Sequence, residues 1–284
     1  MNKLLPTLLI LAAPLASAEQ TIKAPPTQRN FVACPIVLDT EPVPCFVAEY
    51  EGERYFLAVQ SGRGGSTGAD RTIPPQLLHK ALVEGAISDE PRMCGGIVLK
   101  PIQVSVIEDT VDPSCNTMLP SQGYRANGPR AIGLDGDPPG ERKSTAVGES
   151  FGARPGYEER QKMYAEKARA RTPISFTIGY FFDSTYLLYP VEQEQVEDAV
   201  DYANLVGASR IEIHGYRGAA VLSSGGVLAE KEAIAEMRAT KIADILRDFG
   251  WPDDKLVVRW TSEPRHRNGV ADYALRRTVI DVIP

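Results

Sequence analysis

The stretch LAEKEAIAEMRATKIADILRDFG, residues 228–250, decides the fold, because the chain after residue 172 can be read as packed against it. Apolar residues recur at helical spacing, Gly250 can close the last turn, and Pro252 prevents continuation of a helix. We therefore predict an amphipathic helix over residues 228–250, with Arg238 on the face opposite the core. The predicted buried face consists of Ile234, Met237, Ile242, Ile245, Leu246 and Phe249.

The segments around this helix alternate between strand and helix patterns. Strands are predicted at 174–182 (ISFTIGYFF), 209–216 (SRIEIHGY), 255–260 (KLVVRW) and 276–283 (RRTVIDVI), with a second helix at 191–206. The order strand, helix, strand, helix, strand, strand predicts an α+β sandwich over residues 172–284, with both helices on one face of a sheet.

The first half reads differently, as a small β-rich domain over residues 31–120. Alternating apolar runs predict strands at 31–38 and 44–50, then a hairpin turn at Glu51-Gly52-Glu53. The run PPQLLHKALVE at 74–84 is interpreted as a short helix that begins with proline. A further strand is expected at 97–109, bent at Pro101.

All four cysteines lie in this β-rich part. In an exported chain, such a set is typical of two disulfides, and three pairings are possible. Short local loops favour Cys34–Cys45 with Cys94–Cys115. Zinc is the competing interpretation, but no pair has CxxC spacing and His79 is the only histidine in that half. We predict no metal site and no cofactor.

The N-terminus, MNKLLPTLLILAAPLASA, has the features of a secretory leader. A basic Lys3 precedes an apolar run too short to span a bilayer, and small residues end it at Ala16-Ser17-Ala18. Residue 19 is Glu rather than Cys, so lipid attachment is not indicated. We predict cleavage of residues 1–18, no transmembrane segment in the mature chain, and export to the periplasm.

Charge and composition indicate which class of partner is excluded and where the linker between the two domains lies. The net charge of −6 and the pI near 5.3 argue against a nucleic-acid binder, which needs a concentrated basic surface. Residues 121–171 are interpreted as a linker rich in Gly, Pro and charge, ending in a solvated connecting helix at 157–171. The Gly-rich loop at 61–68 lacks the context of a phosphate-binding loop and is interpreted as a flexible surface loop.

Five segments over about residues 174–283 resemble the OmpA-like C-terminal domain, a family that holds the bacterial outer envelope to peptidoglycan. They are FTIGYFFDSTYLL (176–188), IEIHGYRG (211–218), IAEMRATKIADIL (234–246), SEP (262–264) and LRRTVIDV (275–282). The resemblance implies an OmpA-like sandwich that binds peptidoglycan non-covalently, through the diaminopimelate of its stem peptide.

Such a ligand carries a carboxylate and an ammonium group, so its site needs a guanidinium and an acid. The resemblance implies that Arg238 holds the carboxylate and that Arg276 or Arg277 is the second basic group, although only one of two adjacent strand residues can face the site. The expected ligand-binding residues are Arg238, Arg276, Arg277, Gly215, Arg217 and Gly218.

The chain departs from the family pattern at the acid, which corresponds to Gly218. Losing that charge-assisted partner typically costs about 1.5–3 kcal/mol, roughly ten- to a hundredfold in affinity. Glu230 or Glu232 at the helix start can supply an acid instead. Tyr216 and Arg217 also replace family residues.

We predict the first of the following two functions and keep the second as the alternative. In the first, a periplasmic protein of the cell envelope binds peptidoglycan and presents its β-rich domain to an envelope protein partner. In the second, the same fold has lost stem-peptide binding and is a protein-protein interaction module. No nucleophile, base or metal cluster in a recognisable arrangement points to a catalytic site, so an enzyme is not predicted.

Overall fold

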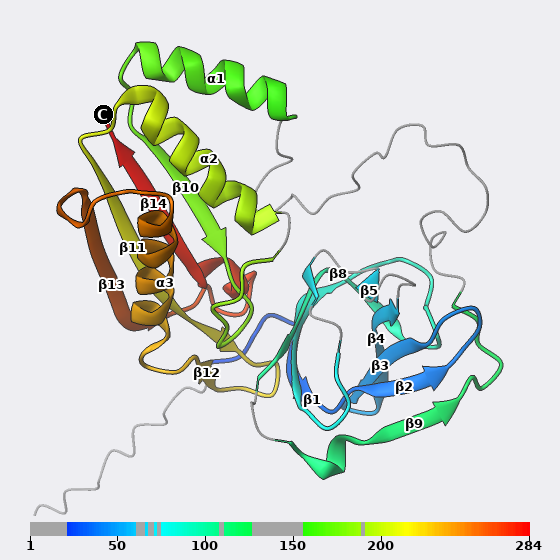
Figure 1. Cartoon of the computed structure of the whole chain (residues 1–284). Helices are drawn as coiled ribbons and strands as arrows, with labels where there is room; N and C mark the ends of the chain where they lie inside the picture. The colour runs from blue at the N-terminus through cyan, green and yellow to red at the C-terminus, as the bar shows by residue number, and fades with distance from the viewer. Residues whose placement is uncertain are drawn as a thin grey trace, which may run out of the picture.

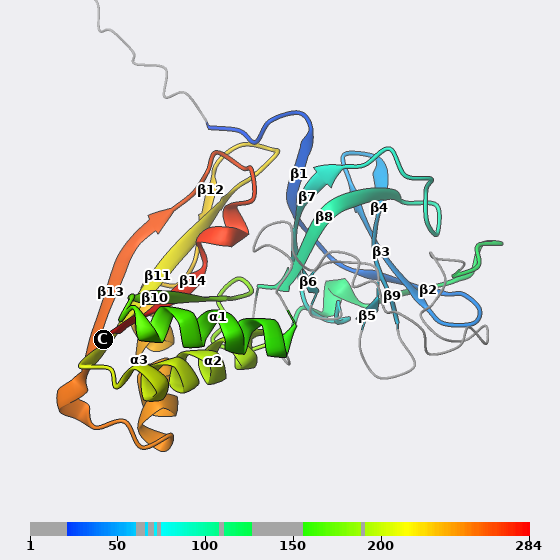
Figure 2. The same cartoon turned by 90° about the horizontal axis from the view of Figure 1, so that it is seen from above.

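The computed structural model describes residues 22–60, 66–67, 71–72, 75–107, 111–126, 156–188 and 191–284. Two sheets divide these residues into a β-rich unit, residues 22–126, and an α/β unit, residues 156–284, which lie side by side in Figures 1 and 2. The predicted leader and most of the predicted Gly-rich loop and linker lie outside the described residues. None of the helices among the described residues is long and apolar enough to cross a membrane.

The β-rich unit is a single nine-stranded sheet. The strand order is β1-β7-β8-β4-β3-β2-β9, with β5 pairing β4 and β6 pairing β8. The strands are β1 (Gln28–Ala33), β2 (Ile36–Asp39), β3 (Cys45–Tyr50), β4 (Glu53–Gln60), β5 (Ser66–Thr67), β6 (Arg71–Thr72), β7 (Ala81–Ile87), β8 (Ile97–Val106) and β9 (Thr117–Pro120). The predicted hairpin at Glu51–Glu53 is confirmed as the β3–β4 turn.

The predicted helix at 74–84 is wrong, because residues 81–84 belong to strand β7. β7 pairs with both β1 and β8, and Leu82 and Val83 are both buried although they point to opposite faces. A strand covered on both faces is apolar without alternation, so its pattern cannot be told from a buried helix by periodicity.

All four cysteines form disulfides, as predicted, but the favoured pairing is wrong. The bonds are Cys34–Cys115 and Cys45–Cys94, with Cα–Cα distances of 4.8 and 6.5 Å. Both connect residues far apart in sequence, by 81 and 49 positions, because the sheet brings distant strands together. Within the described residues, no group of His, Cys, Asp or Glu is arranged to hold a metal ion.

The α/β unit is a sheet with its helices on one face, as Figure 2 shows. The sheet order is β10-β14-β11-β12, and β13 pairs in parallel with β11. The elements are α1 (Tyr157–Arg169), β10 (Ile174–Gly179), α2 (Val191–Val206), β11 (Arg210–Val221), β12 (Val227–Ala229), α3 (Ile234–Asp248), β13 (Leu256–Arg265) and β14 (Arg277–Ile283). The α+β class predicted from the sequence is confirmed.

Helix α3 ends as predicted but begins six residues later. Residues 227–229 form β12 instead, where Ala229 pairs with Ala219 of β11. The backbone N–H of Glu230 still donates to the Gly218 carbonyl, at 3.1 Å. The β11–β12 hairpin therefore includes residues that helical periodicity alone assigns to the first turns of the helix.

The buried face of α3 also differs from the prediction. Met237 and Phe249 are about half exposed, whereas Arg238 has an exposed fraction of 0%. Residues 234, 238, 242 and 246 follow each other at four-residue spacing, which places Arg238 in line with buried Ile234 and Ile242. Placing Arg238 on the solvent face was therefore wrong.

The core of the α/β unit lies between the sheet and its helices. Ile211 and Ile213 of β11 pack there with α2 and α3 side chains. The predicted helix at 157–171 exists as α1, but it is not solvated on all sides, because Tyr164 is buried against Phe176 and Tyr202.

The two units share a buried contact. Leu82 of the β-rich unit packs with Phe182 and Ala220 of the α/β unit. The buried Asn30 side chain donates to the Val221 and Gly269 carbonyls, at 2.9 and 2.8 Å. The β-rich unit is thus held against the end of the α/β sheet near β12.

Candidate functional site

Arg238 is buried at the centre of the region where the ligand site was expected. Its Nε donates to the Ser184 carbonyl at 2.9 Å. Nη1 donates to the Tyr216 carbonyl and to Glu230 Oε2, at 3.1 and 2.9 Å. Nη2 donates to the Phe181 carbonyl and to Glu230 Oε1, at 3.1 and 2.6 Å. All five N–H groups of the guanidinium therefore have acceptors within the chain.

Glu230 is the carboxylate that Arg238 holds. Its side chain has an exposed fraction of 0%. Besides the two bonds from Arg238, Oε1 accepts from the Asp183 backbone N–H at 2.9 Å, and Oε2 accepts from the Gly218 backbone N–H at 2.7 Å. We call these donors, Arg238 with the N–H groups of Asp183 and Gly218, the carboxylate cradle. Such a bidentate, charge-assisted arrangement is how proteins bind carboxylates.

An aromatic residue and an acidic residue lie next to the carboxylate cradle. The Arg238 Cζ lies 4.6 Å from the centroid of the Tyr180 ring. Burial raises the pKa of the Tyr180 hydroxyl, so this residue stays neutral beside the ion pair. Asp183 Oδ1 accepts from the Lys231 backbone N–H at 2.6 Å, which ties the loop after β10 to the segment before α3.

Arg276 is equally buried and also holds an internal carboxylate. Its Nη1 and Nη2 donate to Glu84 Oε2 and Oε1, at 2.6 and 2.8 Å. Glu84 belongs to β7 of the β-rich unit and is 2% exposed. Burial alone would lower the pKa of Arg276, but the Glu84 carboxylate raises it above its ordinary value. Arg276 therefore joins the two units instead of facing an open site.

The Arg276 side chain packs against Gly218, the position at which the OmpA-like family has its acid. A Cβ atom at Gly218 would lie 2.6 Å from Cγ of Arg276 and 3.4 Å from Glu230 Oε2. An aspartate at 218 cannot fit while Arg276 reaches Glu84. The packing of Arg276 and Glu230 against position 218 therefore favours glycine there.

Gly215 and Arg217 have structural contacts. A Cβ at Gly215 would overlap the Ala235 carbonyl, so glycine is what allows α3 to lie so close to β11. Arg217 donates from Nε to the Glu230 carbonyl at 2.6 Å and from Nη1 to the Ser262 carbonyl at 3.1 Å. Arg217 thereby fixes the segment that carries Glu230.

Arg277 begins β14 and points to the face of the sheet opposite the buried side chains of Thr278 and Ile280, whereas Arg276 precedes the strand. The Arg277 Cζ is 5.3 Å from the Tyr216 ring centroid. Of the two candidate acids, Glu230 points inward, whereas Glu232 is exposed. The structure therefore brings Arg238, Gly218 and Arg276 together and separates Arg277 from them.

Glu84, the partner of Arg276, and Asp183, whose backbone N–H donates to Glu230, also belong to the region around Arg238 and Arg276. The sequence analysis identified neither residue as part of the site. The signal for Glu84 was a lone acid inside the apolar run ALVEG of β7. A buried carboxylate requires a cation, and no local cation was available in that run.

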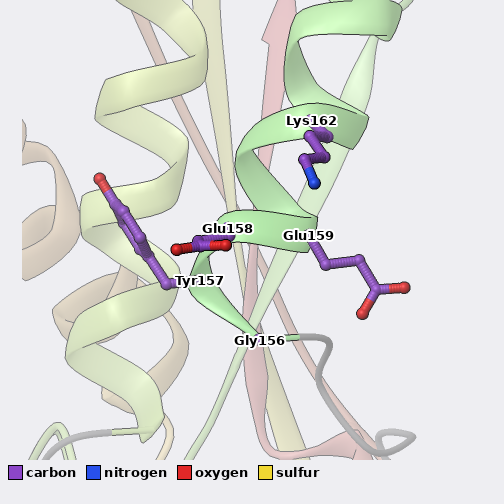
Figure 3. A pocket seen from close by; sticks show the side chains of 5 residues that line it. All are labelled: Gly156, Tyr157, Glu158, Glu159 and Lys162. Carbon is purple, nitrogen blue, oxygen red and sulfur yellow. The ribbon is translucent and has the colours of Figure 1, made fainter.

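A hollow lies at the first turn of α1. It is lined by Gly156, Tyr157, Glu158, Glu159 and Lys162. Figure 3 shows that the side chains of Tyr157 and Glu159 project in different directions, without converging on a common point. We assign no function to it.

Comparison with known proteins finds no matching family model and no matching curated protein. Similar solved structures include the OmpA-like domain of FopA1 from Francisella tularensis, with 15% identity over 39% of this chain and 71% of that chain and a TM-score of 0.31. A MotB-like protein from Desulfovibrio vulgaris has 12% identity over 44% and 91% of the chains, with a TM-score of 0.32. The cell wall anchor of the T6SS from Pseudomonas aeruginosa has 17% identity over 46% and 99%, with a TM-score of 0.31. An OmpA-like domain is thus among the similar structures.

Proposed function

We propose that this chain is an exported, non-enzymatic protein of the bacterial cell envelope, and that its OmpA-like α/β unit is a protein-protein interaction module with its stem-peptide site closed by Glu230. One observation carries the proposal: Arg238, the residue expected to hold the ligand carboxylate, already makes five hydrogen bonds within the chain, two of them to Glu230. The predicted leader and the two disulfides support export to an oxidising compartment such as the periplasm.

A stem peptide can use Arg238 only by displacing Glu230. Breaking a fully buried ion pair costs about 3–5 kcal/mol, because one charge is left without a partner. That cost corresponds to roughly a hundred- to a few thousandfold in affinity. The ligand's ammonium group would also lack the acid that Gly218 replaces. Both effects act against peptidoglycan binding.

Non-covalent peptidoglycan binding through diaminopimelate is the second candidate. It is favoured by the carboxylate cradle itself, since Arg238 and two backbone N–H groups already converge on one carboxylate. If the segment around Glu230 moved outward, the same donors would be available to a ligand.

Co-sedimentation with purified sacculi separates the two candidates. We expect the wild-type protein to stay in the supernatant. The control is the double variant Glu230→Leu/Arg238→Met, which removes both buried charges together and so avoids leaving one unpaired. Wild-type protein that sediments, with sedimentation lost in this folded double variant, would overturn the proposal in favour of peptidoglycan binding.

A further inference from the structure

Among the described residues, no α-helix covers one face of the sheet of the α/β unit. Figure 2 shows α1, α2 and α3 together on one side of β10, β11, β13 and β14. Ile211 and Ile213 point into the core on that side, so His214 and Tyr216, at the alternate positions of β11, point to the other side. This helix-free surface is the open face of the sheet.

Five residues gather on the open face around one aromatic ring. The guanidinium carbons of Arg265 and Arg277 each lie 5.3 Å from the centroid of the Tyr216 ring. The His214 ring stacks on the same tyrosine, with centroids 4.3 Å apart and planes 5° from parallel. Arg259 is paired with His214 in the register of β11 and β13. We call these residues the arginine–tyrosine cluster.

The chain balances the positive charge of the cluster only in part, through Glu212 beside Arg259 and Asp281 near His214. Within the described residues, Arg259, Arg265 and Arg277 form no salt bridge, whereas Arg210 and Arg247 on the same unit each pair with a carboxylate. The Nε of Arg277 is buried and has no hydrogen-bond partner. Three guanidinium groups thus remain available on a protein whose net charge is −6.

The chemistry of the cluster indicates what it can bind. Guanidinium groups match carboxylates with paired hydrogen bonds, and arginine and tyrosine are the residues enriched where protein interfaces derive most of their binding energy. The residues are spread over three adjacent strands of a sheet surface, which is the shape of an interface with another protein.

We propose that the arginine–tyrosine cluster binds an acidic, carboxylate-rich segment of a protein partner. This inference rests on the proposed function, because it supplies the surface that an interaction module requires. The carboxylates pair with Arg265 and Arg277 on either side of Tyr216, and Arg259 extends the positive surface along β13. Salt weakens such binding, since the groups involved are largely at the surface.

Fluorescence anisotropy with the mature full-length protein and a labelled deca-glutamate peptide tests the inference. We expect saturable binding that the double variant Arg265→Gln/Arg277→Gln weakens at least tenfold. The matched control, Arg169→Gln/Arg247→Gln, removes the same charge from helices α1 and α3, on the other side of the sheet, and should change the affinity less than twofold.

Three results would overturn the inference: no saturable binding by the wild type, equal weakening in both double variants, or displacement of the peptide by inorganic phosphate at lower concentration than by acetate. The last result would assign the cluster to a phosphate-bearing ligand. Sacculus sedimentation through Arg238 would overturn the proposed function instead, and the peptide measurement remains independent of that outcome.

Discussion

The buried pair of Arg276 and Glu84 makes the strongest prediction about stability, because it joins the two units. Arg276→Met keeps most of the apolar volume but leaves the Glu84 carboxylate, 2% exposed, without its two hydrogen bonds of 2.6 and 2.8 Å. An uncompensated buried charge costs about 3–5 kcal/mol, out of the roughly 5–15 kcal/mol that stabilise a typical protein. At about 2–4 °C per kcal/mol for a chain of this size, we expect the Tm to fall by roughly 6–20 °C.

Thermal and urea unfolding followed by circular dichroism measure this cost. The double variant Glu84→Met/Arg276→Met removes both charges and should recover most of the loss, since a buried pair is often replaced by apolar residues without net cost. Removal of the exposed Lys100–Glu90 pair by Lys100→Ala is the control and should cost less than about 1 kcal/mol. An Arg276→Met variant as stable as that control would refute the reasoning, because the pair of Arg276 and Glu84 would then not stabilise the contact between the units.

Three further predictions concern other parts of the chain. Gly215→Ala should destabilise the protein by about 3 kcal/mol, because its Cβ would overlap the α3 backbone, whereas Gly156→Ala, with open space around it, should be neutral in the same urea titration. Burial and the neighbouring arginines lower the pKa of His214, so the folded state binds a proton at this residue less readily than the unfolded state. The free energy of unfolding should therefore fall as the pH decreases below about 6.5. His214→Gln should remove the share of this fall that is due to His214. Peptide mapping without reduction should recover the Cys45–Cys94 disulfide, and its removal should cost about 2–5 kcal/mol; recovery of a bond between neighbouring cysteines would contradict the fold.

Local patterns determined which parts of the fold could be predicted. Helix α2 buries Val196, Ala199, Val200 and Ala203 at helical spacing, and its bounds, Val191–Val206, agree with the sequence prediction. The end of α3 was also predictable, since Gly250 adopts a φ of +90° after the last turn. The start of α3, strand β7 and the disulfide pairing were not predictable, because each depends on contacts with segments distant in sequence.

The candidate site divides in the same way. The motif order located Arg238 and the segment that leads from Arg276 into β14, and the missing acid at Gly218 was visible in the sequence. The pairing of Arg238 with Glu230 and of Arg276 with Glu84 could not be predicted, because the sequence does not show which glutamate side chains point inward. The β-rich unit supplies one of the two carboxylates, across 192 positions of sequence.

The most direct test of the closed site is calorimetric titration of the protein with a synthetic stem peptide that ends in diaminopimelate. We predict no saturable binding by the wild type at millimolar peptide, and measurable binding by Glu230→Ala, in which the carboxylate cradle is vacated. Saturable wild-type binding that disappears in the folded Glu230→Leu/Arg238→Met variant would contradict the account, because it would show that Glu230 yields Arg238 to the ligand.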